Sequence, residues 1–305
     1  MGGDVSLLPP AVSSLSANSV PARDLGVAWM NRGHALLLRG DPISLEASLA
    51  AYHEAIALLR QVPLAENPAT ANSLGAALMN RGHLLHRLHG VGQAAVALAA
   101  FADAMTILRD LPADENPWPR RNLVGTLVNR ANLLLDLGQF PAATDAAHDA
   151  LILAVPYEQD EIVDADLGLK SRRVLADALG QLLVAPGANQ AALAREASDL
   201  VDDALALIRH WAARGETSFQ PLAQRFFHYG TQLYRLHQPH FLAEFIQENI
   251  GLDDRALRAT ALAAIDAALQ DRPRDGEFLT IGDPASERRR QAWQELSTLR
   301  TRLVA

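Results

Sequence analysis

The five residues MNRGH occupy positions 30–34 and return unchanged at positions 79–83. A related stretch, VNRAN, lies at 128–132, so each Asn-Arg pair follows the previous one by 49 residues. The Asn-Pro pairs at 67–68 and 116–117 keep the same interval. A fixed period of this size indicates a repeated structural unit, which has to be recognised before any single motif is interpreted.

Each unit contains two segments rich in alanine and leucine, a composition that favours closely packed helices. Gly33, Gly82 and Ala131 occupy the same register in the first segment of the three units. Glycine inside a helix costs about 1 kcal/mol relative to alanine, so its recurrence needs a compensating contact. Two helices approach closely only where side chains are small, and the register therefore predicts a tightly packed helix pair in each unit.

The third unit resembles a tetratricopeptide repeat, which is a helix-turn-helix unit. The residues that carry the resemblance, in the family's order, are Leu127, Ala131, Leu134, Gly138, Phe140, Ala143, Ala147, Ala150 and Pro156. The second helices of the first two units match at Ser48, Tyr52 and Ala55, and at Ala97, Phe101 and Ala104. The resemblance implies an all-α, right-handed α-solenoid. Because the period exceeds that of the family, we expect first helices that extend upstream through 69–79 and 118–128.

The resemblance also divides the chain. We expect a flexible N-terminal tail over 1–24, three repeats over 25–158 and two divergent repeats over 159–250. Gly230, Leu233, Arg235 and Ala243 place the fifth unit, whereas the first helix of the fourth has no unique register. Residues 251–305 are expected to form C-terminal capping helices with a loop near 271–286, because the last repeat of a solenoid needs its apolar face covered.

The composition excludes several classes of function. The chain has no cysteine, which rules out disulfides and thiolate metal sites. Its net charge of −8 opposes a nucleic-acid role, because phosphate binding requires a basic surface. No apolar span of 18 residues appears, and the start of the chain makes a poor signal peptide, so we predict a cytoplasmic protein with no membrane partner.

The candidate binding surface follows from the resemblance, because the first helices of such arrays line a concave groove that holds extended peptides. The implied groove positions are Met30, Asn31, His34, Met79, Asn80, His83, His86, Arg87, Val128, Asn129, Asn132, Asp136 and, from the fifth unit, Phe227. Asn31, Asn80 and Asn129 recur at one register. Each amide has a donor and an acceptor, so these three side chains could hold a peptide backbone. Alternatively, each amide bonds a neighbouring helix or faces water.

Arg32, Arg81 and Arg130 form a second recurring set. Each unit also carries one acidic residue directly before an alanine of its second helix, namely Glu54, Asp103 and Asp149. An ion pair within each unit would explain both sets, and recognition of an anionic ligand is the alternative. A carboxylate clamp of the family's kind is not expected, because its basic positions are held here by Met30, Met79, Val128, His34 and His83.

No catalytic set emerges from the sequence. His83, His86 and His89 are three residues apart, but no carboxylate or cysteine completes a metal site, and we predict neither metal nor cofactor. With no nucleophile-base pair or phosphate loop, the expected function is a non-enzymatic scaffold that binds a partner protein or peptide in the groove. The alternatives are a self-assembling structural subunit, which would be a homo-oligomer, and a ligand or signal-peptide sensor acting through a partner.

Overall fold

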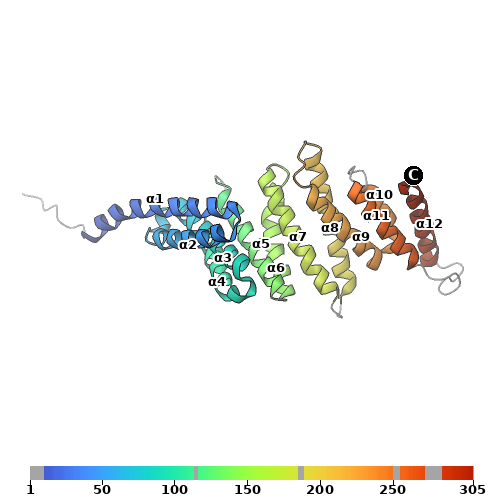
Figure 1. Cartoon of the computed structure of the whole chain (residues 1–305), viewed down its shortest axis with the longest axis horizontal. Helices are drawn as coiled ribbons and strands as arrows, with labels where there is room; N and C mark the ends of the chain where they lie inside the picture. The colour runs from blue at the N-terminus through green and yellow to red at the C-terminus, as the bar shows by residue number, and fades with distance from the viewer. Residues whose placement is uncertain (1–9, 113–115, 185–188, 250–254, 272–283, 305) are drawn as a thin grey trace, which may run out of the picture. The chain divides into compact units, whose positions relative to one another are not determined.

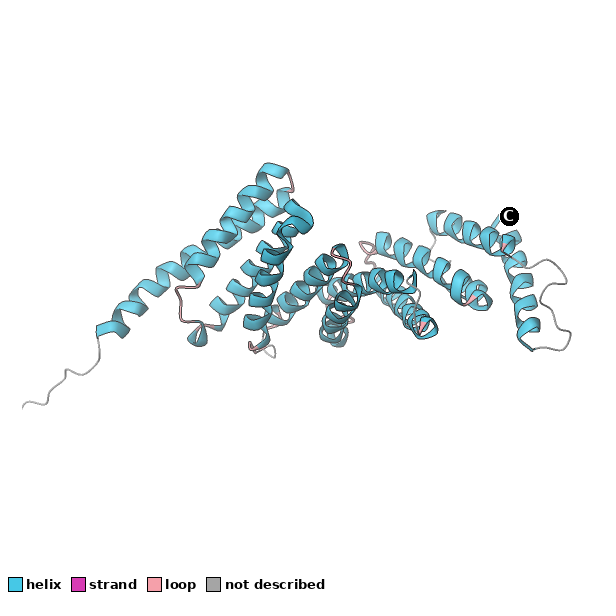
Figure 2. Ribbon diagram, turned by 90° about the horizontal axis from the view of Figure 1, so that it is seen from below, coloured by secondary structure: helices cyan, strands magenta, loops and turns pink. Residues whose placement is uncertain are grey.

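A computed structural model describes residues 10–112, 116–184, 189–249, 255–271 and 284–304. Throughout these ranges the chain forms α-helices joined by turns and short 3-10 segments, without a strand (Figure 2). The predicted all-α class is therefore confirmed. The chain divides into two compact units, Met1–Ala154 and Val155–Ala305.

Three helix pairs make up the first unit. Its helices are α1 (Pro10–Arg39), α2 (Pro42–Leu59), α3 (Pro68–His89), α4 (Ala94–Arg109), α5 (Trp118–Asp136) and α6 (Phe140–Ala154). Helices α1 and α2, α3 and α4, and α5 and α6 pack as pairs joined by short turns (Figure 1). Each pair also contacts the next, through α2 with α3 and α4 with α5, and α3 contacts both α1 and α5. The first unit is thus a series of three packed helical hairpins.

The recurring glycines allow the two helices of the first and second hairpins to approach closely. A Cβ atom on Gly33 would lie 3.1 Å from the Tyr52 ring, and one on Gly82 would lie 2.5 Å from Phe101. Seven residues earlier in each first helix, Gly26 and Gly75 lie equally close to Leu59 and Leu108. The predicted close approach of the two helices is confirmed at both positions.

The Asn-Pro pairs mark where the first helices begin. Helix α3 starts at Pro68, and α5 starts directly after Pro117. Proline suits the first turn of a helix because its missing N–H would have no partner there anyway. Asn116 also accepts a 3.1 Å hydrogen bond from the Trp118 amide. As predicted, the additional residues of the long period extend the first helices upstream.

The first helix begins earlier than expected. Helix α1 starts at Pro10, so residues 10–24 of the predicted tail are helical, while 1–9 lie outside the described residues. Helix α1 contains Pro21, and an internal proline costs a helix about 3 kcal/mol. Contact with α2 works against that cost, because Ala22 is buried and Gly26 packs against Leu59.

One apolar stretch contradicts the prediction that the chain has no apolar span of 18 residues. Pro68–Arg109 is long and apolar enough to cross a membrane by length and composition, with a mean hydropathy of 1.6 in its richest window. The stretch comprises two helices, α3 and α4, which pack against each other. Ala97 and Ala104 of α4 lie buried in this hairpin, and 28% of the apolar window is buried.

The second unit continues with helices α7 (Ile162–Val184), α8 (Gln190–Ala212), α9 (Gln220–His237), α10 (Leu242–Asn249), α11 (Arg255–Gln270) and α12 (Pro284–Val304). Helix α8 packs against both α7 and α9, α10 and α11 contact α9, and α12 contacts α10 and α11. The predicted C-terminal helices are thus present, and most of the loop expected near 271–286 lies outside the described residues. A buried ion pair anchors the start of this unit. Arg172 donates to both carboxylate oxygens of Glu158, at 2.6 and 2.9 Å.

Candidate functional site

The three recurring asparagines lie at one register on α1, α3 and α5. Asn31 is exposed and Asn129 is half-buried, and neither has a hydrogen-bond partner among the described residues. Asn80 differs, because it approaches the Tyr52 hydroxyl of the preceding hairpin. Burial raises the pKa of Tyr52 to about 12, and the Asn80 side chain opposes that rise. We call the solvent-facing side of α1, α3 and α5 around Asn31, Asn80 and Asn129 the first-helix surface.

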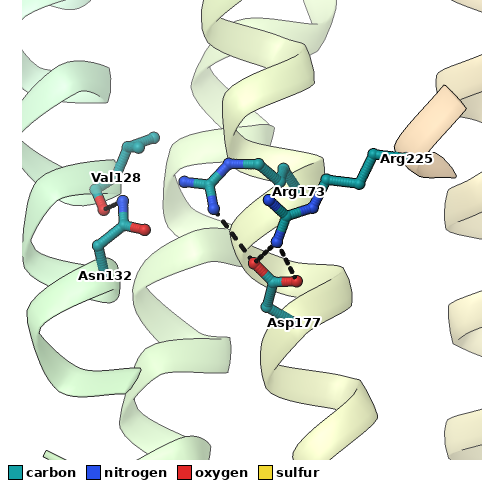
Figure 3. Close-up of polar contacts among 5 residues, drawn as sticks. All are labelled: Val128, Asn132, Arg173, Asp177 and Arg225. Atoms are coloured by element: carbon teal, nitrogen blue, oxygen red, sulfur yellow. Dashed lines mark hydrogen bonds and ion pairs between the residues drawn. The ribbon is translucent and has the colours of Figure 1, made fainter. Parts of the chain in front are cut away.

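Two other asparagine contacts were not foreseen. Asn122 of α5 donates a 2.9 Å hydrogen bond to the side chain of Asn72 on α3, which ties two hairpins together. Asn132, expected in the groove, donates a 2.8 Å hydrogen bond to the carbonyl of Val128 in its own helix (Figure 3). Because the Asn132 amide is hydrogen-bonded within its own helix, it has fewer groups left to bind a ligand. We therefore assign Asn132 a structural role.

The predicted ion pairs within each unit are wrong. Asp103 pairs at 2.8 Å with Arg60, which caps the second helix of the preceding hairpin, and not with Arg81. Arg32 stacks over the Trp29 ring at 4.8 Å. Among the described residues, none of the three recurring acids forms an ion pair with the arginine of its own first helix. In the described part of the chain, Arg81 and Arg130 have no acidic partner.

Charge is divided between the helices of each hairpin. Helix α3 contains Arg81 and Arg87 and no acidic residue, and α5 has a single acid, Asp136, at its end. Five exposed acids lie on the second helices, namely Glu46, Glu54, Asp103, Asp145 and Asp149, whereas the first helices carry two, Asp24 and Asp136. The residues one helical turn before and after Arg81 are alanine or leucine. Arg81 therefore has no acidic residue in its own helix with which to form an ion pair. The first-helix surface is therefore positive although the chain as a whole is acidic.

The histidines do not gather into a metal site. His86 lies 2.7 Å from Asp136, which connects α3 to α5, while His34 is exposed and His83 half-buried. No group of three or more side chains suited to hold a metal ion occurs within the described ranges. His86 thus serves as a contact between hairpins.

The apolar residues predicted for the groove are mostly covered. Phe227 is fully buried and stacks on Phe245 at 5.5 Å between ring centroids, and Val128 is only 6% exposed. Met30 and Met79 remain half-buried, with the Met79 sulfur against Gly125 of the next hairpin. Phe227 and Val128 are therefore core residues, and the expectation that they contact a ligand is wrong. Because core residues and groove residues are both apolar, the sequence alone could not show which of the two Phe227 and Val128 would be.

Arg87, expected in the groove, lies at the end of α3. Its guanidinium reaches the turn between α1 and α2, where it would lie 3.7 Å from a side chain placed on Gly40. Arg87 is nevertheless exposed, as is Gly40's neighbour Arg39. The guanidinium therefore lies beside the first hairpin, at the end of the first-helix surface.

The second unit has a cavity with a mainly apolar wall. About 270 Å³ in volume, it lies between α7 and α9 and is lined by Arg173, Ala176, Asp177, Arg225, Phe226, His228, Tyr229 and Gln232. His228 precedes Gly230 by two residues, as Asn80 precedes Gly82, so it occupies the register of the asparagines. Sequence reasoning selected the neighbouring Phe227 and missed this cavity, because the register of α7 was ambiguous.

A second cavity of about 270 Å³ lies among α8, α9 and α10. Its wall includes four acids, Asp199, Asp202, Glu244 and Glu248. Tyr234 donates a 2.7 Å hydrogen bond to Asp202. Burial raises the pKa of Asp202 above its ordinary value, and the charges of Glu248 and Asp199 add to that rise.

Comparisons with known proteins add little to this geometry. No protein-family model and no curated protein sequence matches the chain. Among solved structures, the crystal structure of BtubC (BKLC) from P. vanneervenii is similar with a TM-score of 0.39 at 16% sequence identity. The similarity covers 78% of this chain and 98% of that one. A similarity at this level carries no inference about function.

Proposed function

We propose that this protein is a non-enzymatic scaffold of the tetratricopeptide type, an α-solenoid that binds an extended segment of a partner protein on its first-helix surface. The observation that carries the proposal is the set of unpaired polar groups at one register of successive hairpins. Among the residues that the structure describes, the amides of Asn31 and Asn129 have no hydrogen-bond partner, and the guanidinium groups of Arg81 and Arg130 have no acidic partner.

The amides suit a peptide backbone. An extended strand presents N–H and C=O groups at regular intervals, and an asparagine amide can bond to both kinds of group. Because these bonds do not depend on the side chains of the partner, they supply affinity without strict sequence selection. Asn80 contributes less, since it lies beside the Tyr52 hydroxyl.

The arginines add a preference for acidic partner segments. Helix α3 has no carboxylate to compete for Arg81, and the acid of α4, Asp103, pairs with Arg60. A carboxylate in the partner would form a charge-assisted hydrogen bond, which is stronger than a neutral one. The partner expected is therefore an extended peptide with several acidic side chains.

Selection from a display library of random peptides of about twelve residues tests the proposal. The wild type should enrich acidic peptides. The triple variant Asn31→Ala, Asn80→Ala, Asn129→Ala should lose most of that binding, and Arg81→Gln with Arg130→Gln should remove the acidic preference. The matched control is Glu46→Ala, Thr106→Ala, Asp145→Ala, which changes three exposed residues on the second helices.

The outcome also separates the proposal from self-assembly. If the asparagine variant, shown to be folded by circular dichroism, enriches the same peptides as the wild type, the first-helix surface is not the binding site. If no peptide is enriched and light scattering shows a stable oligomer, the protein is a self-assembling subunit instead.

A further inference from the structure

The cavity between α7 and α9 is large enough for one apolar side chain. Its volume is about 270 Å³, whereas an apolar cavity of about 150 Å³ already holds a benzene ring. Phe226 and Ala176 lie buried in its mainly apolar wall, and the Tyr229 ring lies 3.4 Å from where a Cβ atom on Gly180 would be. A ligand in the cavity would therefore lie beside two aromatic rings and an alanine methyl group.

The charged groups of the wall already have partners within the protein. Asp177 accepts a 3.1 Å hydrogen bond from Arg173, four residues earlier on α7, and bonds of 2.9 and 2.8 Å from Arg225 on α9 (Figure 3). Gln232, also in the wall, accepts a 3.2 Å hydrogen bond from Arg235. An uncharged group can enter the cavity without breaking these contacts, whereas a charged ligand would have to compete with them.

One hydroxyl of the wall is unpaired, but an apolar ligand takes no partner from it. The Tyr229 oxygen is buried and forms no hydrogen bond within the described ranges. Burial also raises the pKa of Tyr229 to about 12, so the hydroxyl stays uncharged at neutral pH. Because this oxygen has already lost its contact with water, an apolar group beside the ring removes no further hydrogen bond. The wall thus suits an apolar ligand better than its polar residue names suggest.

The first unit shows how the chain itself fills a space of this kind. The Met79 side chain of α3 lies against Gly125 of α5, with its sulfur 3.1 Å from where a Cβ atom would be. This contact and that between Tyr229 and Gly180 each join two successive first helices across a glycine. In the first unit a methionine of the protein occupies the space, whereas a cavity remains between α7 and α9. A side chain of the same kind from another polypeptide would complete the packing.

We propose that this cavity binds one large aliphatic side chain, leucine or methionine, of the partner polypeptide. The inference rests on the proposed function, because it takes the ligand to be an extended polypeptide. His228, which also lines the cavity, is exposed and occupies the position on α9 that the asparagines hold in the first unit. The backbone of the segment would therefore pass His228 while its aliphatic side chain contacts Phe226 and Tyr229.

Short probes test the cavity separately from the first-helix surface. N-acetyl-leucinamide is the probe, N-acetyl-alaninamide lacks three of its side-chain carbons, and the α-amide of N-acetyl-glutamate adds a carboxylate. NMR of ring-labelled tyrosine locates the binding, since the chain has four tyrosines, of which Tyr229 lines this cavity. We expect the Tyr229 resonances to shift saturably with the leucine probe. Its binding should be at least about tenfold tighter than that of the alanine probe, because each buried methylene contributes about fourfold.

Two variants separate the apolar wall from the charges. Ala176→Leu fills the cavity and should abolish binding of the leucine probe, whereas Ala192→Leu, the same change at an exposed position of α8, should not. Arg225→Gln removes an ion pair and none of the apolar wall, so binding of the leucine probe should stay the same. Circular dichroism establishes that each variant is folded. If Ala176→Leu does not fold, Arg225→Gln and the comparison of probes still decide.

Equal binding of the leucine and alanine probes, tighter binding of the glutamate probe, or retained binding in a folded Ala176→Leu would overturn the assignment. The variant Asn31→Ala, Asn80→Ala, Asn129→Ala should bind the leucine probe as the wild type does. If its peptide selection is also unchanged, the first-helix surface fails and the cavity stands. If peptide selection depends on the asparagines but no probe shifts Tyr229, the cavity assignment fails alone.

Discussion

Gly82 on α3 faces the Phe101 ring on α4 so closely that a methyl group in its place would lie 2.5 Å from the ring carbon Cε1. The same pairing recurs between Gly33 and Tyr52, and between Gly230 and Phe245. In each case a large ring on one helix occupies the space left by the missing side chain on the other. The helix thus tolerates the roughly 1 kcal/mol cost of glycine because an aromatic side chain is buried there.

Gly82→Ala should destabilise the first unit by about 1–3 kcal/mol, the usual cost of overpacking a core. Gly33→Ala should cost less, since its added methyl group would lie 3.1 Å from Tyr52. Urea unfolding followed by circular dichroism measures both. In a double-mutant cycle, Phe101→Leu should partly rescue Gly82→Ala, and purely additive effects would show that the two residues do not compete for one space.

Removing one partner of the buried Glu158–Arg172 pair should cost about 3–5 kcal/mol, because the remaining charge would be left in the protein interior. Both side chains are less than 10% exposed, and the Glu158 carbonyl also accepts a hydrogen bond from the Trp211 indole. Arg172→Met and Glu158→Gln should each lower the unfolding midpoint. Arg60→Gln, in the exposed pair with Asp103, is the control and should change stability by less than about 1 kcal/mol.

Asp202→Asn should raise thermal stability at pH 7. The folded protein raises the pKa of this carboxyl, so between the unfolded pKa and the folded pKa the folded state binds more protons than the unfolded state. Stability attributable to Asp202 therefore falls as pH rises through that window, and a neutral amide avoids the loss. Asparagine can still accept from Tyr234. Thermal unfolding should show a benefit at pH 7 that shrinks toward pH 4, and a benefit that grows with acid would contradict the assignment.

Tyr52→Phe should leave stability unchanged or increase it slightly. The hydroxyl is buried and lacks a hydrogen-bond partner within bonding distance, so its removal takes away an uncompensated polar group while the ring stays against Gly33. The measurement is the unfolding midpoint in urea, with Tyr52→Leu as a control that also removes the ring and should be clearly destabilising. A loss above about 1 kcal/mol in Tyr52→Phe would show that the Asn80 amide bonds this hydroxyl after all.

The periodicity was sufficient to predict the helix pairs and the close contact at Gly33 and Gly82, because both depend on spacing along one chain. The partners of the polar residues were not predictable in the same way. Asp103 was expected beside Arg81 and instead pairs with Arg60, since the partner depends on how consecutive hairpins pack. Phe227 and His228 are neighbours in sequence, yet one is core and the other lines a cavity, a difference of one helical step of about 100°.

In the third hairpin, side chains of different sizes occupy the positions equivalent to these glycines and their partners. Where the second hairpin has Gly75 with Leu108 and Gly82 with Phe101, the third has Val124 with Ala154 and Ala131 with Ala147, and these four are all buried. In the first pair the same number of side-chain carbons is divided differently between the two helices, whereas the second pair is smaller in the third hairpin, because two alanines stand where the second hairpin has glycine and phenylalanine. If α6 replaced α4 beside α3, it would leave an unfilled hole next to each glycine, and α4 beside α5 would collide with Val124. The hairpins share one architecture, but their helices are not interchangeable. The sizes of the side chains on each second helix determine which first helix it can pack against.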